Sequence, residues 1–292
     1  MEHSANNPGA DVQERSCAVS ERGQIPQWQE RTALLLGEEA LVRLKEAVVV
    51  VAGLGGVGAY AAEMTARAGV GRMVLIDSDR VGESNKNRQL LAMNSTLGRL
   101  KTEVMAERLL DINPALQLVT VAEYLTEDNV PAILEGALEK ISAAAQQVSF
   151  GAGGDPQTVA PAGTALRPDF LIDAIDTLAP KIALISHCVH SGIPLVSSMG
   201  AGAKLDATKV HLTDLSKSYN CPLAFILRKK LRKIGITKGF PVVFSEELPE
   251  RDAIVPTEGE RNKKSQVGTI SYLPAVFGCV CAQAAVRHIT AR

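Results

Sequence analysis

Short apolar runs alternate with longer helical repeats along the first 200 residues. Apolar, often β-branched runs predict five buried strands, at 48–52, 73–76, 116–121, 169–174 and 193–197. A period near 3.6 residues predicts helices at 37–47, 57–68, 98–112, 180–191 and 222–234. Thr126 precedes one more helical stretch, which it would cap. This alternating order predicts a mostly parallel α/β sheet with helices on both faces.

The regions outside this pattern set the predicted domain organisation. Residues 1–30 are polar and lack an apolar segment, which predicts a disordered leader and no signal peptide. Ala, Gln, Gly and Pro dominate 142–167, which predicts a flexible insertion. We expect residues 31–292 to form a single domain, extended by a smaller C-terminal α+β part.

Residues 269–286 carry no charge and are almost long enough to span a bilayer. Pro274 and Gln283 interrupt the stretch, so a buried or dimer-facing helix is the favoured interpretation and membrane association is not. A membrane-tethered scaffold is the non-catalytic alternative.

Composition narrows the class of protein. The 292 residues are 46% hydrophobic and 22% charged with a net charge of −1, so a nucleic-acid substrate would need a local basic patch. Such a patch is predicted on the helix at 222–234, from Arg228, Lys229, Lys230, Arg232 and Lys233. The five cysteines form no CxxC pair, which predicts free thiols, a cytoplasmic protein and no structural zinc.

A glycine-rich turn joins the first predicted strand to the next helix. It contains Gly53, Gly55, Gly56 and Gly58, a pattern typical of loops whose backbone amides approach phosphates. Asp77 ends the following strand, where a carboxylate binds a ribose hydroxyl. These two features fit an NAD-dependent oxidoreductase equally well.

The residues after Asp77 favour ATP chemistry instead. Arg88, in the segment that begins at Asn85, and Lys101, on the next predicted helix, would bring two cations to the phosphates. Asp173 and Asp176 follow the fourth predicted strand, and Asp176, further past its end, is the better candidate for holding Mg²⁺ against the phosphates.

Six motifs occur in order: RTALLLGEEAL, GLGGVG, LIDSDRV, SNKNRQ, GRLKTEVMAERLLDINP and DAIDT. Together they resemble the E1-like (ThiF/MoeB/HesA) adenylating enzymes over 31–215. The resemblance implies a Rossmann-like fold and an ATP site built from the glycine loop, Asp77, Asn85, Arg88, Lys101 and Asp176. It also implies that Arg31 reaches into the neighbouring subunit's site, and hence a homodimer.

Further matches, at 193–196, 213–217 and 243–246 among others, resemble the tRNA threonylcarbamoyladenosine dehydratase branch of this family. That branch implies ATP-dependent dehydration (cyclisation) of N6-threonylcarbamoyladenosine at position 37 of tRNA, through activation of the threonyl carboxylate. It leaves open whether AMP or ADP is released. It also implies sulfur-transfer partners (CsdA/CsdE-like), although Pro241 and Val242 stand where the family often has a cysteine. The alternative is adenylation of the C-terminal glycine of a ubiquitin-like sulfur carrier, against which the missing zinc-binding CxxC pairs argue.

Overall fold

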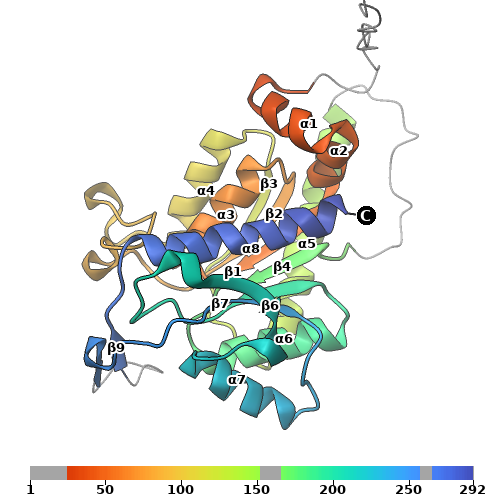
Figure 1. The fold of residues 1–292 in the computed structure, drawn as a ribbon. Coiled ribbons are helices and arrows are strands. Elements are labelled where there is room, and N and C mark those ends of the chain that lie inside the picture. Colours follow the sequence, from red (N-terminus) through yellow and green to blue (C-terminus); the bar gives the residue numbers. More distant parts are fainter. Residues whose placement is uncertain (1–24, 152–165, 257–264, 292) are drawn as a thin grey trace, which may run out of the picture.

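A seven-stranded sheet forms the centre of the molecule (Figure 1). The computed structural model describes residues 25–151, 166–256 and 265–291. The strand order is β3-β2-β1-β4-β5-β7-β6, and all neighbours are parallel except β6 and β7. The strands are β1 Val48–Ala52, β2 Arg72–Ile76, β3 Gln117–Val121, β4 Phe170–Asp173, β5 Leu195–Ser198, β6 Val210–Asp214 and β7 Pro241–Ser245. The predicted α/β fold is therefore confirmed.

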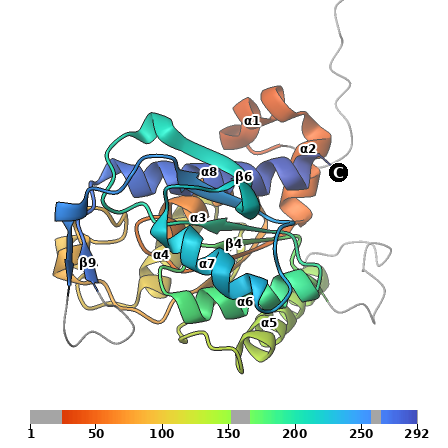
Figure 2. The ribbon, with the colours of Figure 1, turned by 60° about the horizontal axis from the view of Figure 1, so that its bottom comes forward.

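Helices cover both faces of the sheet (Figure 2). Helices α3, α4 and α8 lie over one face, and α5, α6 and α7 over the other. The helices are α1 Glu30–Leu36, α2 Glu38–Glu46, α3 Gly58–Arg67, α4 Lys101–Ile112, α5 Val130–Gly151, α6 Leu178–His190, α7 Pro222–Arg232 and α8 Tyr272–Thr290. The 3₁₀ helix η1 Gln27–Gln29 precedes α1.

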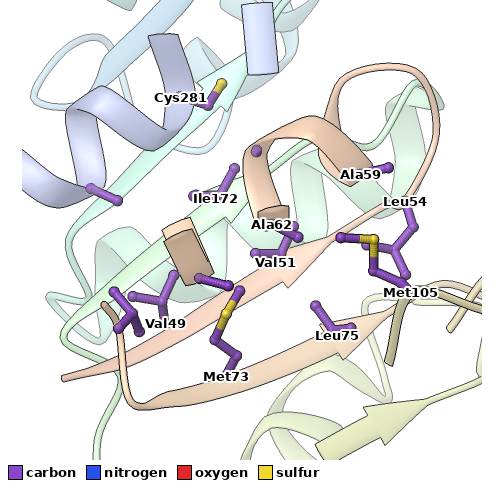
Figure 3. Close-up of a cluster of buried hydrophobic side chains, with 14 of the residues drawn as sticks. Val49, Val51, Leu54, Ala59, Ala62, Met73, Leu75, Met105, Ile172 and Cys281 are labelled. Atoms are coloured by element: carbon purple, nitrogen blue, oxygen red, sulfur yellow. The ribbon is translucent and has the colours of Figure 1, made fainter. Parts of the chain in front are cut away.

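Side chains that alternate along the strands build a core on each face. In β1, Val49 and Val51 point toward α3 and α8, whereas Val48 and Val50 point toward the opposite helices. Figure 3 shows the first of these clusters, which joins Val51 of β1 and Ile172 of β4 to Ala62 of α3. Every residue of β1 is buried, which explains why the strand reads as an unbroken apolar run.

Two predicted boundaries are corrected by the structure. Residues 27–30, assigned above to a disordered leader, form η1 and the first residue of α1. Residues 142–151, assigned to the insertion, continue helix α5 as far as Gly151. Residues 1–24 of the expected leader and 152–165 of the expected insertion lie outside the described residues.

The C-terminal part adds strands to the main sheet and a separate hairpin beside it. Strands β6 and β7 complete one side of the sheet, and β8 Ile254–Pro256 pairs with β9 Ser265–Val267 in an antiparallel hairpin. Within the described ranges, α8 is the one helix long and apolar enough to cross a membrane, and half of that stretch is buried. Its packing against α3, β4 and β5 accounts for its apolar composition.

Candidate nucleotide-binding site

The loop that follows β1 lies where the sheet changes its direction of growth. From β1 the chain adds β2 and β3 on one side, and β4 then pairs with β1 on the other, with Ala52 opposite Asp173. Ligands of open α/β sheets bind at the carboxyl ends of the strands that flank such a switch point. The glycine loop and the segment that leads to Asp176, the predicted magnesium ligand, therefore begin next to each other at the same edge of the sheet.

Two glycines of this loop are required by the protein's own packing. A Cβ on Gly58 would lie 1.7 Å from the Gly53 carbonyl oxygen, and one on Gly53 would lie 2.8 Å from the Ala174 carbonyl oxygen. Gly53 also has φ +87°, a conformation that favours glycine. These contacts hold the loop tightly against the chain that leaves β4.

Gly55 is different, because the protein leaves space beside it. A Cβ there would meet only the Gln89 side-chain nitrogen, at 3.8 Å, and the φ of Gly55 is not in the left-handed region. Packing within the chain therefore does not require glycine at this position. The open surface lies just before the first turn of α3, where backbone N–H groups and the helix dipole favour phosphate.

Asp77 shapes the same loop from the end of β2. Its Oδ2 accepts a hydrogen bond from the Leu54 N–H at 2.5 Å, and its Oδ1 accepts one from the Asp79 N–H at 2.8 Å. Burial raises the pKa of Asp77 above its usual value, and the Lys101 ammonium and the Leu54 N–H offset only part of that rise. Each carboxylate oxygen keeps a further lone pair, so the predicted contact with a ribose hydroxyl is compatible with these bonds.

Lys101 is the buried cation of the site. It begins α4, only 4% of its surface is exposed, and its Nζ lies 2.8 Å from Asp79 Oδ2. An ammonium group this buried needs a counter-charge, which Asp79 supplies directly and Asp77 reinforces. The two carboxylates thus hold one positive charge next to the glycine loop.

Arg88 packs against the loop from the segment that follows Asn85. Its carbonyl oxygen and Cγ lie 3.3 and 3.5 Å from the position that a Cβ on Gly56 would occupy. The guanidinium Nη1 donates to the Ser84 carbonyl at 2.9 Å and to Asn87 Oδ1 at 2.7 Å. This tether fixes the direction of the side chain and leaves Nε and Nη2 for a ligand.

Asn85 organises the turn that carries Arg88. Its Oδ1 accepts a hydrogen bond from the Gly82 N–H at 3.0 Å, and its carbonyl accepts from the N–H groups of Arg88 and Gln89. The structure therefore gives Asn85 a role in positioning Arg88.

The two aspartates after β4 have separate roles. Asp173, the weaker magnesium candidate, is fully buried and lies 2.8 Å from the Lys181 ammonium, while the Ser197 hydroxyl donates to it at 2.6 Å. Lys181 also donates to the Ile175 carbonyl at 2.9 Å, which anchors the segment leading to Asp176. Asp173 is thus an internal counter-ion, whereas Asp176 is exposed beyond the strand end.

Sequence reasoning missed Lys181 and Ser197. One signal was available, because Lys181 is the only Lys or Arg in the mostly apolar helix α6. A lone charge on a helix that must be buried indicates a buried partner. In the described parts of the chain, no cluster of three or more His, Cys, Asp or Glu side chains would hold a metal ion.

Arg31 lies on α1, at the other end of the molecule from the glycine loop. Near its start, α8 contacts the loop through Pro274 against Gly56, and at its end the Thr290 carbonyl accepts a hydrogen bond from Arg43 of α2. The intervening 16 helical residues span roughly 24 Å at 1.5 Å each. Because α1 packs against α2, Arg31 is remote from the loop of its own chain.

A glycine loop at the switch point, a carboxylate after β2 and two cations on the neighbouring segments are features of the nucleotide-binding proteins of the doubly wound α/β class. A model of the ThiF family matches residues 29–292, and the chain belongs to that family.

Similar proteins match most of the chain. A tRNA threonylcarbamoyladenosine dehydratase of Bacillus subtilis is 36% identical over 257 residues, which cover 86% of this chain and 89% of that protein. Among solved structures, E. coli TcdA, a tRNA N6-threonylcarbamoyladenosine dehydratase in complex with ATP, superposes with a TM-score of 0.72 at 35% identity, covering 92% of this chain and 98% of the other. The same enzyme in complex with AMP gives a TM-score of 0.71 with the same identity and coverage.

Proposed function

We propose that this chain is an ATP-dependent tRNA threonylcarbamoyladenosine dehydratase, which cyclises N6-threonylcarbamoyladenosine at position 37 of tRNA. The observation that carries the proposal is a pair of cations beside the glycine loop: Arg88 packs on Gly56, and Lys101 lies buried beside Asp77 and Asp79. A dinucleotide-dependent oxidoreductase has no use for this pair of cations. Near full-length similarity to proteins named as such dehydratases supports the choice of substrate.

The chemistry requires activation and proximity, without a protein nucleophile. The threonyl carboxylate attacks a phosphate of ATP and breaks its phosphoanhydride bond, so that pyrophosphate leaves from the α-phosphate or ADP from the γ-phosphate. Negative charge grows on phosphate oxygens that Arg88 and Lys101 would stabilise. The neighbouring carbamoyl oxygen then attacks the activated carboxyl carbon, and the bond to the phosphorylated oxygen breaks. An oxazolone ring closes as the carbamoyl N–H loses its proton. The nucleoside loses one water overall, and its oxygen leaves on the phosphate product.

Residues around the loop fit ATP and Mg²⁺. The free space beside Gly55 would take the phosphates, Asp77 the ribose, and Asp176 the metal. A single carboxylate suits Mg²⁺, which commonly completes its octahedral shell with substrate phosphates and water.

The exposed face of α7 would contact tRNA. Lys229, Lys230, Arg232 and Lys233 are exposed there. Arg228 differs from the others, because its guanidinium Nη1 donates to the Ser218 carbonyl at 2.6 Å and stabilises the turn before the helix. Of the predicted basic face, the residues that would bind RNA are therefore Lys229, Lys230, Arg232 and Lys233.

A homodimer would complete each site. Leu34 and Leu35 of α1 are 88% and 82% exposed, which marks an apolar surface one turn from Arg31. Since Arg31 is remote from the loop in its own chain, it would reach the partner's loop. A cytoplasmic location and contact with sulfur-transfer proteins complete the proposal.

The decisive experiment is mass spectrometry of nucleosides from tRNA incubated with the protein and ATP. We expect threonylcarbamoyladenosine to lose one water, and the nucleotide released, AMP or ADP, identifies which phosphate is attacked. Pyrophosphate exchange driven by a ubiquitin-like sulfur carrier, with unchanged tRNA, would overturn the proposal.

Two variants locate the chemistry. Arg88→Ala and Lys101→Ala should each lower turnover at least about 100-fold, because each removes a charge facing the phosphates. Arg99→Ala is the matched control, since Arg99 pairs with Glu107 on the surface of the same segment. Undiminished turnover in either test variant would show that the phosphate site lies elsewhere.

A further inference from the structure

A cavity lies next to Arg88, beside the proposed phosphate site. Its volume is about 420 Å³, and its walls come from the segment at 84–88 on one side and from the β8–β9 hairpin on the other. Asn87 donates a hydrogen bond to the Thr269 carbonyl at 2.9 Å and joins the two walls. The volume falls within the roughly 300–1,000 Å³ usual for small-molecule sites.

Arg88 belongs to both the cavity and the phosphate site. Its backbone and Cγ pack on Gly56, and the side chain also lines the cavity. None of the loop glycines appears among the described lining residues, so a nucleotide seated on the loop leaves the cavity free. A ligand in the cavity would therefore meet the phosphates at Arg88.

The lining suits a planar, partly polar ligand with one anionic end. Val255 supplies apolar surface, and Gln266, directly opposite Val255 in the hairpin register, supplies an amide donor and acceptor. Arg88 would attract a carboxylate, while Asp252 on the hairpin side would repel it and accept N–H or O–H donors. These charges orient a ligand with its carboxylate toward the loop.

We propose that this cavity binds the modified nucleoside, with the base against Val255 and the threonyl carboxylate at Arg88. The inference rests on the proposed function and gives the acyl substrate a site separate from that of ATP. It also gives the β8–β9 hairpin a function in recognising the modified nucleoside, whereas α7 would contact the rest of the tRNA.

Two variants test the proposal, one that fills the cavity and one that removes a polar group from its wall. Val255→Trp adds bulk at a side chain that is 58% exposed, so the fold should tolerate it, and Gln266→Ala removes the amide. Leu110→Trp on α4, 41% exposed, is the matched control. We expect both cavity variants to raise the KM for threonylcarbamoyladenosine-bearing tRNA about tenfold or more, with the Kd for ATP unchanged within about twofold. Calorimetry with the free nucleoside should show the same loss of binding.

The outcomes separate the two proposals. If the wild-type protein fails to dehydrate the tRNA, the proposed function falls and the cavity assignment falls with it. If the wild type is active and both variants keep their KM, the cavity assignment alone is wrong. If ATP binding weakens in parallel with the KM, the cavity belongs to the nucleotide site, which also overturns the assignment.

Discussion

At the scale of single residues, the glycine loop contains two glycines that the fold requires and one, Gly55, that packing leaves free. Gly58 and Gly53 have carbonyl oxygens within 2.8 Å of any added Cβ, whereas Gly55 has no neighbour closer than 3.8 Å. Sequence alone treats these glycines alike. Only the three-dimensional neighbours show which of them a methyl group would disturb.

Gly55→Ala and Gly58→Ala should therefore fail in different ways. Gly55→Ala should melt close to the wild-type temperature but bind ATP about tenfold or more weakly, because its methyl group enters the phosphate space. Gly58→Ala should lose about 1–3 kcal/mol of unfolding free energy or fail to fold, since the new atom overlaps the Gly53 carbonyl. Thermal denaturation and ATP calorimetry measure the two effects. Normal ATP affinity in Gly55→Ala would contradict this assignment of the loop.

Burial explains the role of three cysteines. Cys188 is buried, and burial together with the nearby Asp173 carboxylate raises its thiol pKa to about 12. Cys221 and Cys281 are buried as well. A buried thiol packs as a small apolar side chain, as the sequence predicted for Cys188 and Cys221.

At the scale of elements, a carboxylate joins the helix of the glycine loop to the helix of Lys101. Glu63 on α3, 5% exposed, accepts hydrogen bonds from Arg67 Nε at 2.8 Å and from Arg108 Nε of α4 at 2.5 Å. Burial would raise the pKa of Glu63, but the hydrogen bonds from the two arginines outweigh it, and the pKa is lowered below its usual 4.5. The ionised form therefore stabilises the contact between α3 and α4.

The stabilisation by Glu63 should depend on pH in one direction. A carboxylate with a lowered pKa contributes its stability above its unfolded pKa of about 4.5 and loses it as pH falls through the folded value. Glu63→Gln should thus cost about 1–2 kcal/mol of unfolding free energy at pH 7, and less as the pH falls below about 4.5. Urea denaturation of both proteins at pH 7 and near pH 3.5 tests this. An equal difference at both pH values would exclude an electrostatic cause.

Strands of the central sheet were the most predictable elements. The β1 prediction coincides with Val48–Ala52, and β2, β4 and β5 differ from theirs by one or two residues at an end. Burial on both faces forces unbroken apolar runs, which are visible in a sequence. Strands β6 and β7 were missed for different reasons. The partly exposed β6 lacks such a run, whereas β7, buried from Val242 to Ser245, has one that was not assigned to a strand.

The sequence could predict which residues belong to the candidate site, but not the hydrogen bonds and ion pairs that hold them. Motif spacing predicted that Gly55, Arg88 and Lys101 serve one site. In the structure Arg88 packs on Gly56, and Lys101 pairs with Asp79. The carboxylate that neutralises Lys101 and the tether that holds Arg88 depend on distances between segments, which no single-chain pattern encodes. For the same reason Asp173, which is paired with Lys181 inside the protein, was considered as a metal ligand.

At the scale of the whole molecule, tRNA should bind across α7 through charge. Lys229→Ala, Lys230→Ala and Lys233→Ala together should weaken tRNA binding and lower the slope of log Kd against log salt by up to about two to three, because each neutralised phosphate contributes about one. Titration of labelled tRNA at several salt concentrations measures the slope. Lys45→Ala on α2 is the control, and the triple variant should keep its ATP affinity. An unchanged slope would place the RNA on another face.

The proposed homodimer belongs to the scale of the whole molecule, and complementation between two inactive variants tests it. Arg31→Ala and Asp176→Ala should each abolish turnover as pure dimers, because every site then lacks one group. In a mixed dimer one site combines Asp176 of the first subunit with Arg31 of the second and stays whole, so affinity-purified mixed dimers should recover about half of wild-type turnover. Differently tagged subunits, co-expressed and purified through both tags, provide the sample. Recovery requires Arg31 to act across the interface, as its position roughly a helix length from its own loop indicates. Persistent inactivity of dimers that sizing and tag counting show to be mixed would mean that Arg31 acts within its own subunit.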